Sequence, residues 1–339
     1  MCPQQYLIEY VLGRKSPSNK KADKGTIVHK VLEILALFAY HQQNKSNRFD
    51  DEILGEVIIK DSRYMDAVYV YELTVEIYNY YTARFTHHEW SEKDLKDCVK
   101  WVNKALDHNE GMFDPRFRSI IMPEQHFDIL IEKPWAEYDY TYKSQNIKGK
   151  LGIKGTIDLI TKIDDQTIEI IDWKTGRRLD WATGEEKTFA KLQKDFQLRL
   201  YHYAISKLYP QYPNIIVSIN FINDGGPFTL MFNEDDLKDT EEMIRKKYEE
   251  IKKTTKPKLN KTWKCRKLCH FGKNTFEEDP NIAPIYEYRE NKFINIGQPM
   301  TICEQIKHDT DAMGLDAVID KYTPEGYNVA SYKAPGSTE

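Results

Sequence analysis

The sequence predicts a mixed α/β fold in which helices flank a mostly mixed central sheet. Three observations predict it. Apolar residues recur at helical spacing before about residue 108, short alternating runs follow over about residues 124–174, and a helix with further strands comes next. The order helix, strands, helix, strand is typical of α/β proteins.

The first helix is predicted over residues 25–35, where apolar side chains recur at helical spacing. The same spacing continues from about residue 50 to residue 108, so we expect a helical insertion at about residues 45–115. The chain on both sides of this insertion is needed for one core. We therefore expect residues 1–275 to form a single domain that includes it.

Strands are predicted over residues 127–131, 155–160 and 168–174, and the last two form a hairpin around the turn-like residues 164–166. A helix is expected over about residues 191–208, ended by Pro210. Strands over residues 215–221 and 228–232 follow, and Asn233 suits the N-cap of a long charged helix to about residue 253. Residues 276–339 are expected to form an irregular C-terminal extension with a frayed end at residues 334–339.

Composition bounds the class of protein. Of 339 residues, 40% are hydrophobic and 30% charged, which is typical of a soluble globular chain, and the net charge of −4 means that any nucleic-acid surface must be local. No apolar run reaches the roughly 18–20 residues of a membrane span. The start of the chain lacks the basic and apolar segments of a signal peptide. We therefore expect a cytoplasmic protein without a membrane partner, whose five cysteines are reduced thiols or metal ligands.

The predicted hairpin carries the residues with the clearest chemistry. Because strand side chains alternate, Asp172 and Lys174 share one face and Trp173 lies on the other. Asp158 comes from the neighbouring strand. Two carboxylates can hold a divalent cation, and a lysine beside them can orient or deprotonate a water, as metal-assisted hydrolysis of a phosphodiester requires. An ordinary surface hairpin with an Asp–Lys pair is the alternative.

Two further pairs have helical spacing. Gln197 and Tyr201 are four residues apart and share a helix face, and His29 follows Gly25 by four residues on the first helix. Alone, the first pair also fits the polar edge of a helix, and His29 also fits a hydrogen-bonded core histidine.

Together these motifs, in this order and spacing from about Cys2 to His270, resemble the RecB-like branch of the PD-(D/E)XK nuclease superfamily. The resemblance implies a restriction-endonuclease-like α-β-β-β-α-β core that binds Mg²⁺ or Mn²⁺. It implies metal ligands at His29, Asp158, Asp172 and the backbone carbonyl of Trp173. Lys174 would orient the attacking water, Gln197 and Tyr201 would brace the site or contact the nucleic-acid backbone, and Glu124 matches an acidic position often found there.

The cysteines raise a second metal question. Relatives such as AddB and the CRISPR-adaptation nucleases hold a [4Fe–4S] cluster with one upstream and three downstream cysteines. Here Cys2 precedes His29, but downstream only Cys265 and Cys269 lie close together, with three residues between them. His270 or Cys303 would have to complete four ligands. A cluster, a zinc site and plain thiols all remain open, and the plain thiols are favoured because a fourth nearby cysteine is missing.

Residues 252–273 are strongly basic, with nine Lys or Arg residues, no Asp or Glu, and two interleaved rings, Trp263 and Phe271. This segment fits either a solvated loop or a surface that follows phosphates and stacks bases. On the second interpretation, the nucleic-acid contacts are Lys261, Lys264, Arg266 and Lys267.

The function expected from the resemblance is a metal-dependent exodeoxyribonuclease that acts on single-stranded DNA or duplex ends in recombination, repair or processing. A catalytically weak nucleic-acid-binding scaffold and a structure-specific endonuclease are the alternatives. Because the sequence contains no G-x-x-x-x-G-K-[ST] motif, any unwinding would need a separate helicase or recombination protein as partner.

Overall fold

The computed structural model describes residues 2–59, 63–108, 110–142, 145–180, 184–276, 286–289, 292–295 and 300–327. The chain divides into two compact units. The catalytic-fold unit consists of Ser18–Ile131 and Gly152–Ile244. The second unit consists of Met1–Pro17, Glu132–Leu151 and Arg245–Glu339.

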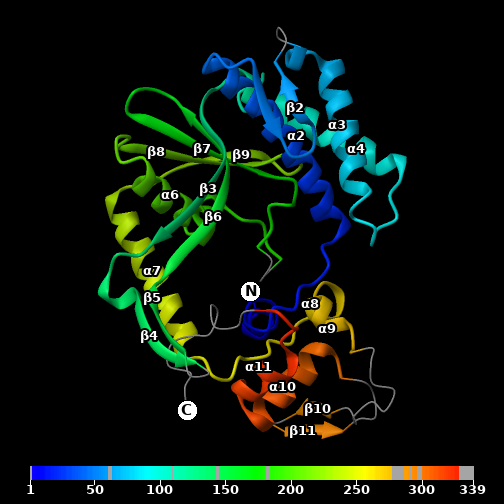
Figure 1. Cartoon of the computed structure of the whole chain (residues 1–339), viewed down its shortest axis with the longest axis vertical. Coiled ribbons are helices and arrows are strands. Elements are labelled where there is room, and N and C mark those ends of the chain that lie inside the picture. The colour runs from blue at the N-terminus through cyan, green and yellow to red at the C-terminus, as the bar shows by residue number, and fades with distance from the viewer. Residues whose placement is uncertain are drawn as a thin grey trace. The chain divides into compact units, whose positions relative to one another are not determined.

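A five-stranded mixed sheet lies at the centre of the catalytic-fold unit (Figure 1). Its strand order is β3 (Ser119–Leu130), β6 (Gly152–Lys162), β7 (Thr167–Lys174), β8 (Asn214–Phe221) and β9 (Gly226–Met231). The β7–β8 pair is parallel and the other three pairs are antiparallel. The predicted mixed α/β fold, including the hairpin of β6 and β7, is therefore confirmed.

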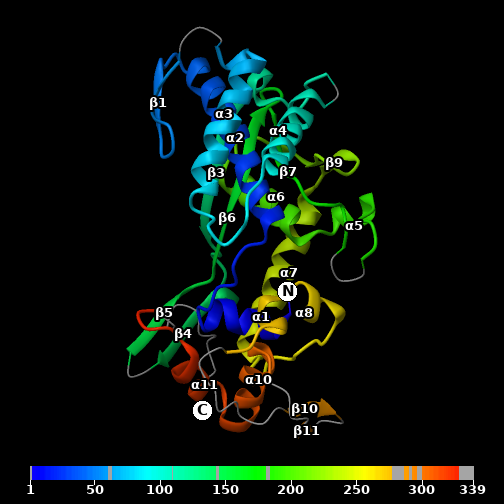
Figure 2. The ribbon, with the colours of Figure 1, turned by 90° about the vertical axis from the view of Figure 1, so that its right-hand side faces the viewer.

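Helices cover both faces of this sheet. On one face Ile171 and Trp173 pack with the helices α2 (Lys20–Gln43), α3 (Ala67–Thr82) and α4 (Glu92–Asp107), which lie side by side in Figure 2. On the other face Ile168 and Ile170 pack with α6 (Phe196–Leu208). Alternate residues of β7 thus enter opposite cores, as the period of two predicts.

The predicted helical insertion is wrong at its start. Residues 48–58 form a hairpin of β1 (Arg48–Asp51) and β2 (Gly55–Ile58) before the helices begin. The Asp51 side chain accepts hydrogen bonds from the backbone N–H groups of Ile53 and Leu54, which reverses the chain. Strands of four residues are too short for alternation to reveal them, and the helical spacing that predicts the insertion comes from apolar residues further along the chain, from Val68 onward.

The predicted helix over residues 191–208 is split into α5 (Phe189–Gln193) and α6. Asp195 breaks it, because its carboxylate accepts a hydrogen bond from the N–H of Gln197 and caps a new helix. The predicted charged helix is present as α7 (Glu234–Lys253), with Asn233 accepting from the N–H groups of Asp235 and Asp236.

The second unit is built from short elements. Its helices and strands are α1 (Pro3–Tyr6), the π-helix η1 (Leu7–Val11), β4 (Glu137–Tyr142), β5 (Gln145–Lys150), α8 (Trp263–Lys267), α9 (His270–Lys273), β10 (Tyr286–Arg289), β11 (Lys292–Asn295), α10 (Ile302–Met313) and α11 (Leu315–Tyr322). Short 3-10 turns also occur: η2 (Arg63–Met65) and η3 (Pro115–Phe117) in the catalytic-fold unit, and η4 (Pro134–Ala136) in the second.

The expectation of an irregular C-terminal extension is wrong for its described part, since α10 and α11 are helical. Thr301 and Glu304 form a capping box that starts α10. Ile306 and Val318 from these helices pack against Leu7, so the C-terminal helices and the start of the chain share a core. The predicted frayed end at residues 334–339 lies outside the described residues. None of the helices in the described ranges combines the length and apolarity needed to cross a membrane.

Candidate active site

The candidate site lies where the pairing of β6 and β7 ends. The last registered pair is Leu159 with Ile171. Beyond it the Asp158 carboxylate accepts a hydrogen bond of 2.8 Å from the backbone N–H of Trp173, in place of a backbone carbonyl. The side chain of Asp158 is thereby fixed beside the end of β7, next to Asp172.

Asp172 and Lys174 form a close ion pair on the face of β7 opposite Trp173. The Lys174 Nζ atom lies 2.9 Å from Oδ1 and 2.7 Å from Oδ2 of Asp172. The Asp172 side chain is only 1% exposed, whereas that of Lys174 is 31% exposed. Burial raises the pKa of Asp172 to about 6. The positive charge of Lys174 lowers this pKa, and the nearby Asp158 carboxylate raises it. Burial favours a neutral Lys174, but the Asp172 carboxylate outweighs it and raises the lysine pKa.

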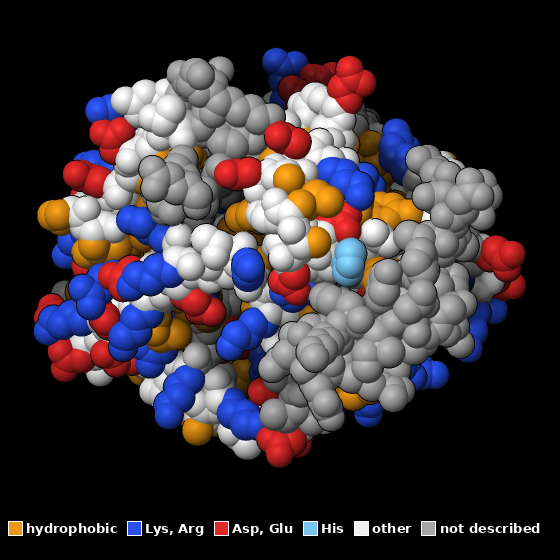
Figure 3. Space-filling model, turned by 90° about the horizontal axis from the view of Figure 1, so that it is seen from below, with side chains coloured by type: hydrophobic (Ala, Val, Ile, Leu, Met, Phe, Trp, Pro, Cys, Tyr) orange, Lys and Arg blue, Asp and Glu red, His pale blue; other side chains and the backbone are white. Residues whose placement is uncertain are grey.

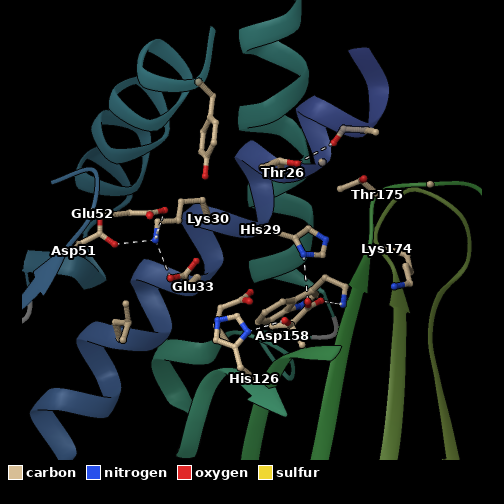
Figure 4. Close-up of a pocket in the computed structure, with 18 of the residues that line it drawn as sticks. Thr26, His29, Lys30, Glu33, Asp51, Glu52, His126, Asp158, Lys174 and Thr175 are labelled. Carbon is tan, nitrogen blue, oxygen red and sulfur yellow. Dashed lines mark hydrogen bonds and ion pairs between the residues drawn. The ribbon is translucent and has the colours of Figure 1, made fainter. Parts of the chain in front are cut away.

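His29 reaches the same place from α2. Its Nδ1 atom lies 3.4 Å from Oδ1 of Asp158, and Figure 4 shows the ring directed at that carboxylate. Burial opposes a charge on His29, but Asp158 outweighs burial and raises the histidine pKa. A bound cation would compete with this proton, because the same carboxylate attracts both.

Gly25 allows α2 to approach the end of β7. A Cβ atom at residue 25 would lie 2.8 Å from Oγ1 of Thr175, closer than van der Waals contact permits. Glycine at this position therefore fixes how near His29, one helical turn later, can come to the strand that carries Asp172.

Glu124 completes the group of acids. It lies on β3 between Pro123 and Gln125, whose partners on β6 are Leu159 and Ile157, so it faces the position of Asp158. Its φ of 44° is in the left-handed region, which non-glycine residues enter mostly under structural constraint. Burial, followed by the nearby carboxylates Asp158 and Glu33, raises the pKa of Glu124 to about 8.

His29, Glu124, Asp158 and Lys174 border one pocket of about 770 Å³, whereas the buried Asp172 is not among its lining residues. Its lining includes His29, Glu124, Asp158, Trp173 and Lys174, together with Ala22, Gly25, Thr26, Lys30, Glu33, Leu37, Asp50, Asp51, Glu52, Tyr81, His126, Thr156, Thr175 and Gly176.

The sequence interpretation missed one side of the pocket. Lys30 is nearly buried and lies 2.8 Å from both Glu33 and Asp51, as Figure 4 shows. Glu33 could have been found, because it follows His29 by four residues and shares its helix face. Asp51 and Glu52 could not, because the β1–β2 hairpin was not predicted.

Gln197 and Tyr201 lie on α6, on the side of Asp172 away from α2. Gln197 donates a hydrogen bond of 2.6 Å to the Tyr201 hydroxyl. Burial and then the Asp172 carboxylate raise the pKa of Tyr201. The pair therefore contacts the site through Asp172.

The second unit brings together four cysteines. Cys2, Cys265, Cys269 and Cys303 form no disulfide. Burial raises the pKa of the Cys303 thiol, and the thiols of Cys2, Cys269 and Cys265 raise it further, which places all four in one neighbourhood. Among the described residues, no three of these sulfurs lie within 4.8 Å of one another. His270 is hydrogen bonded to Asn274 through Nδ1, at 2.8 Å.

The basic segment differs from the expectation at one ring. Phe271 is only 3% exposed and packs in a core, so it cannot stack on a base, whereas Trp263 is 61% exposed. Lys261 is paired with Glu304 at 2.8 Å. Lys264, Arg266 and Lys267 lie on or at the end of α8. Figure 3 shows one face of the molecule on which basic side chains are mixed with acidic ones.

The family model described as the PD-(D/E)XK nuclease superfamily matches residues 1–273 of the chain. A search of curated proteins finds no match.

The contact between Gly25 and Thr175 yields a testable prediction. We expect Gly25→Ala to lower the free energy of unfolding by about 1–3 kcal/mol, because the added Cβ atom displaces the Thr175 side chain or the backbone that carries it. Adding Thr175→Ala, which removes the clashing atom, should restore much of this loss. Adding Thr175→Val, which keeps an atom at the Oγ1 position, should not. Denaturant titrations of the single and double variants check this, and equal stability of both double variants would contradict it.

Proposed function

Because the chain belongs to the PD-(D/E)XK nuclease superfamily, we propose that it is a metal-dependent DNA nuclease with its active site at the end of β7. The observation that supports this most strongly is the convergence of four groups. Lys174 lies 2.7 Å from Asp172, and His29 lies 3.4 Å from Asp158. The weak or inactive scaffold is disfavoured, since none of the four core groups is replaced.

The donor set fits a divalent cation. Asp158 and Asp172 supply carboxylate oxygens, His29 an imidazole nitrogen and Trp173 a backbone carbonyl, the ligands that the resemblance implies for Mg²⁺ or Mn²⁺. Burial raises the pKa of Asp172 although Lys174 and His29 oppose this shift, and a bound cation would favour the ionised carboxylate further. A cation held there would stabilise charge on the phosphoryl oxygens and would lower the pKa of a bound water. Glu124 is proposed as a nearby acid that hydrogen-bonds this water.

Lys174 is proposed to orient the attacking water. Its raised pKa keeps it protonated near neutral pH, so it donates hydrogen bonds rather than accepting a proton. Asp172 holds its ammonium group, while the partial exposure of the side chain leaves room for a water. Gln197 and Tyr201 are proposed as positioning residues that hold Asp172 from the other side.

We propose that the enzyme acts at DNA ends, as the resemblance to the RecB-like branch implies. The pocket supports this, because one wall carries the carboxylates Glu33, Asp51 and Glu52. Lys30 offsets only part of their charge. An acidic wall repels a phosphate backbone that would continue past it, which favours a strand end over an internal segment. The proposed role is in recombination, repair or processing, with unwinding supplied by a separate helicase or recombination protein.

We also propose that Cys2, Cys265, Cys269 and Cys303 hold a [4Fe–4S] cluster. Cys303 supplies the fourth thiol that the local spacing lacked. One zinc ion would need sulfurs within about 3.8 Å of one another, given Zn–S bonds of about 2.3 Å, whereas a cluster attaches each thiolate to a different iron. The exposed Trp263 and the basic side chains of α8 next to Cys265 are the proposed DNA contacts of this unit.

The first test compares Asp172→Ala with Lys174→Ala. Asp172→Ala should reduce cleavage by about 10²-fold or more and weaken Mn²⁺ binding, because a ligand is lost. Lys174→Ala should lower kcat by about 10²-fold while Mn²⁺ and DNA binding persist, since it acts on the water. Asp128→Ala removes an exposed carboxylate from β3 and serves as the control. Near wild-type cleavage by Asp172→Ala at saturating Mg²⁺ would refute the assignment.

The second test concerns ends. A linear single strand should be degraded, whereas a closed circle of the same sequence should survive under the same conditions. Gel analysis over time checks this, with Asp172→Ala protein prepared in parallel to exclude a contaminating nuclease. Rapid linearisation of the circle would support the endonuclease alternative instead.

The third test concerns the cysteines. Protein purified without oxygen should be brown and contain about four irons per chain. Cys303→Ser should lose this iron, whereas Cys98→Ser, a buried cysteine of the catalytic-fold unit, should keep it. Colourless protein with one zinc per chain, or Cys303→Ser protein with full iron content, would contradict the cluster.

A further inference from the structure

A second group of metal-ligating side chains lies in the catalytic-fold unit, apart from the proposed nuclease residues. Asp23 is in the first turn of α2, and His87 and His88 are in the loop between α3 and α4. One ligand atom from each residue lies within 4.8 Å of the other two. We propose that Asp23, His87 and His88 form a structural zinc site.

The distances suit a tetrahedral ion. With bonds of about 2.0–2.1 Å from zinc to nitrogen and oxygen, ligand atoms lie about 3.3 Å apart. The Nε2 atom of His88 lies 2.8 Å from Oδ2 of Asp23, and that of His87 lies 3.4 Å from the same oxygen. Both imidazoles thus present Nε2 to one carboxylate, and the ligand atoms of all three residues lie within 4.8 Å of one another, so they would draw closer together around a bound ion.

The hydrogen bonds around Asp23 hold His87 least firmly of the three groups. Oδ2 of Asp23 accepts a hydrogen bond of 2.8 Å from the Ser18 hydroxyl and lies 2.8 Å from Nε2 of His88. Nε2 of His87 has longer contacts of 3.3 Å to the hydroxyl and to the backbone carbonyl of Ser18. Its ring centroid lies 4.0 Å from that of His88, so both imidazoles meet beside one carboxylate. An ion that accepts an electron pair from each nitrogen would hold His87 more firmly than these long contacts do.

Burial and the two nitrogen donors favour a zinc ion over a larger cation that prefers oxygen ligands. The side chains of Asp23 and His88 are 5% and 14% exposed, so two of the three ligands are largely buried. His87 is more exposed, which leaves an entry path and room for a water as fourth ligand. Two imidazoles and one carboxylate with a water form the donor set of known catalytic zinc sites, whereas structural zinc sites mostly have four protein ligands. The structural role of this site therefore rests on the segments that it connects, and Ser18 would hold the carboxylate in place by its hydrogen bond.

Such an ion would connect the α3–α4 loop to the helix that carries His29. Asp23 precedes His29 by six residues on α2. His87 and His88 come more than sixty residues after Asp23. A cross-link over a loop of this length restricts the unfolded chain and stabilises the folded one. The expected role is therefore structural.

The experiment is a Zn²⁺ and Co²⁺ titration of the full chain carrying Asp172→Ala, Cys265→Ser and Cys269→Ser, which weakens the other two metal sites. We expect one ion per chain, a rise in melting temperature, and weak visible Co²⁺ bands without the strong thiolate bands of a cysteine site. His87→Gln and His88→Gln together keep side-chain donors toward Asp23 and should reduce the affinity at least tenfold. His308→Gln, in the second unit, should leave it unchanged.

A measurement on the unmutated protein guards against misfolding of these variants. Zn²⁺ should protect His87 and His88 from carbethoxylation by diethyl pyrocarbonate, as mass spectrometry of the peptide that contains both would show. Unchanged modification with Zn²⁺ present, or Zn²⁺ binding that survives the double glutamine variant, would overturn the proposal. Neither outcome bears on nuclease activity, which rests on a different set of residues.

Discussion

The geometry of the candidate active site depends on the hydrogen bond from the backbone N–H of Trp173 to the Asp158 carboxylate. At this point β6 and β7 stop exchanging backbone hydrogen bonds, and a side chain takes over the pairing. Two carboxylates are thereby held close together in a largely buried place, where like charges are costly. His29 and Lys174 partly balance them, and each comes from an element whose position the core determines.

The two cores on either side of the sheet determine that position. Trp173 and Ile171 hold β7 against α2, while Ile168 and Ile170 hold it against α6. Because alternate residues enter opposite cores, a slip of one residue would bury Lys174 in place of Trp173. The register of one strand therefore fixes both the packing and the placement of Asp172. The same packing brings Gly25 against Thr175, which fixes the height of His29 above the strand.

Much of this fold follows from local patterns in the sequence. The β6–β7 hairpin, β8, and the helices α2 and α7 are all predicted, because each has a strong period or a clear cap. The resemblance to the PD-(D/E)XK superfamily predicts that His29, Glu124, Asp158, Asp172 and Lys174 share one site, and the structure brings them to one place. Local patterns alone group only Asp158, Asp172 and Lys174, because these lie on the two strands of one hairpin.

Other parts depend on contacts that no local pattern encodes. The β1–β2 hairpin relies on an Asx turn at Asp51 and on strands too short to show alternation. Cys303 lies 34 residues beyond Cys269, so only the packing of α10 brings it near the other thiols. Asp23 and His88 are likewise distant in sequence and meet because α2 packs against α3 and α4.

Anomalous diffraction from crystals containing Mn²⁺ tests most directly whether Asp158, Asp172 and His29 hold the metal. We expect a manganese peak about 2 Å from carboxylate oxygens of both Asp158 and Asp172, with His29 as a further ligand. That peak should vanish in crystals of the Asp172→Ala variant. Manganese bound only elsewhere, for example between Glu33 and Asp51, would contradict the assignment of the active site.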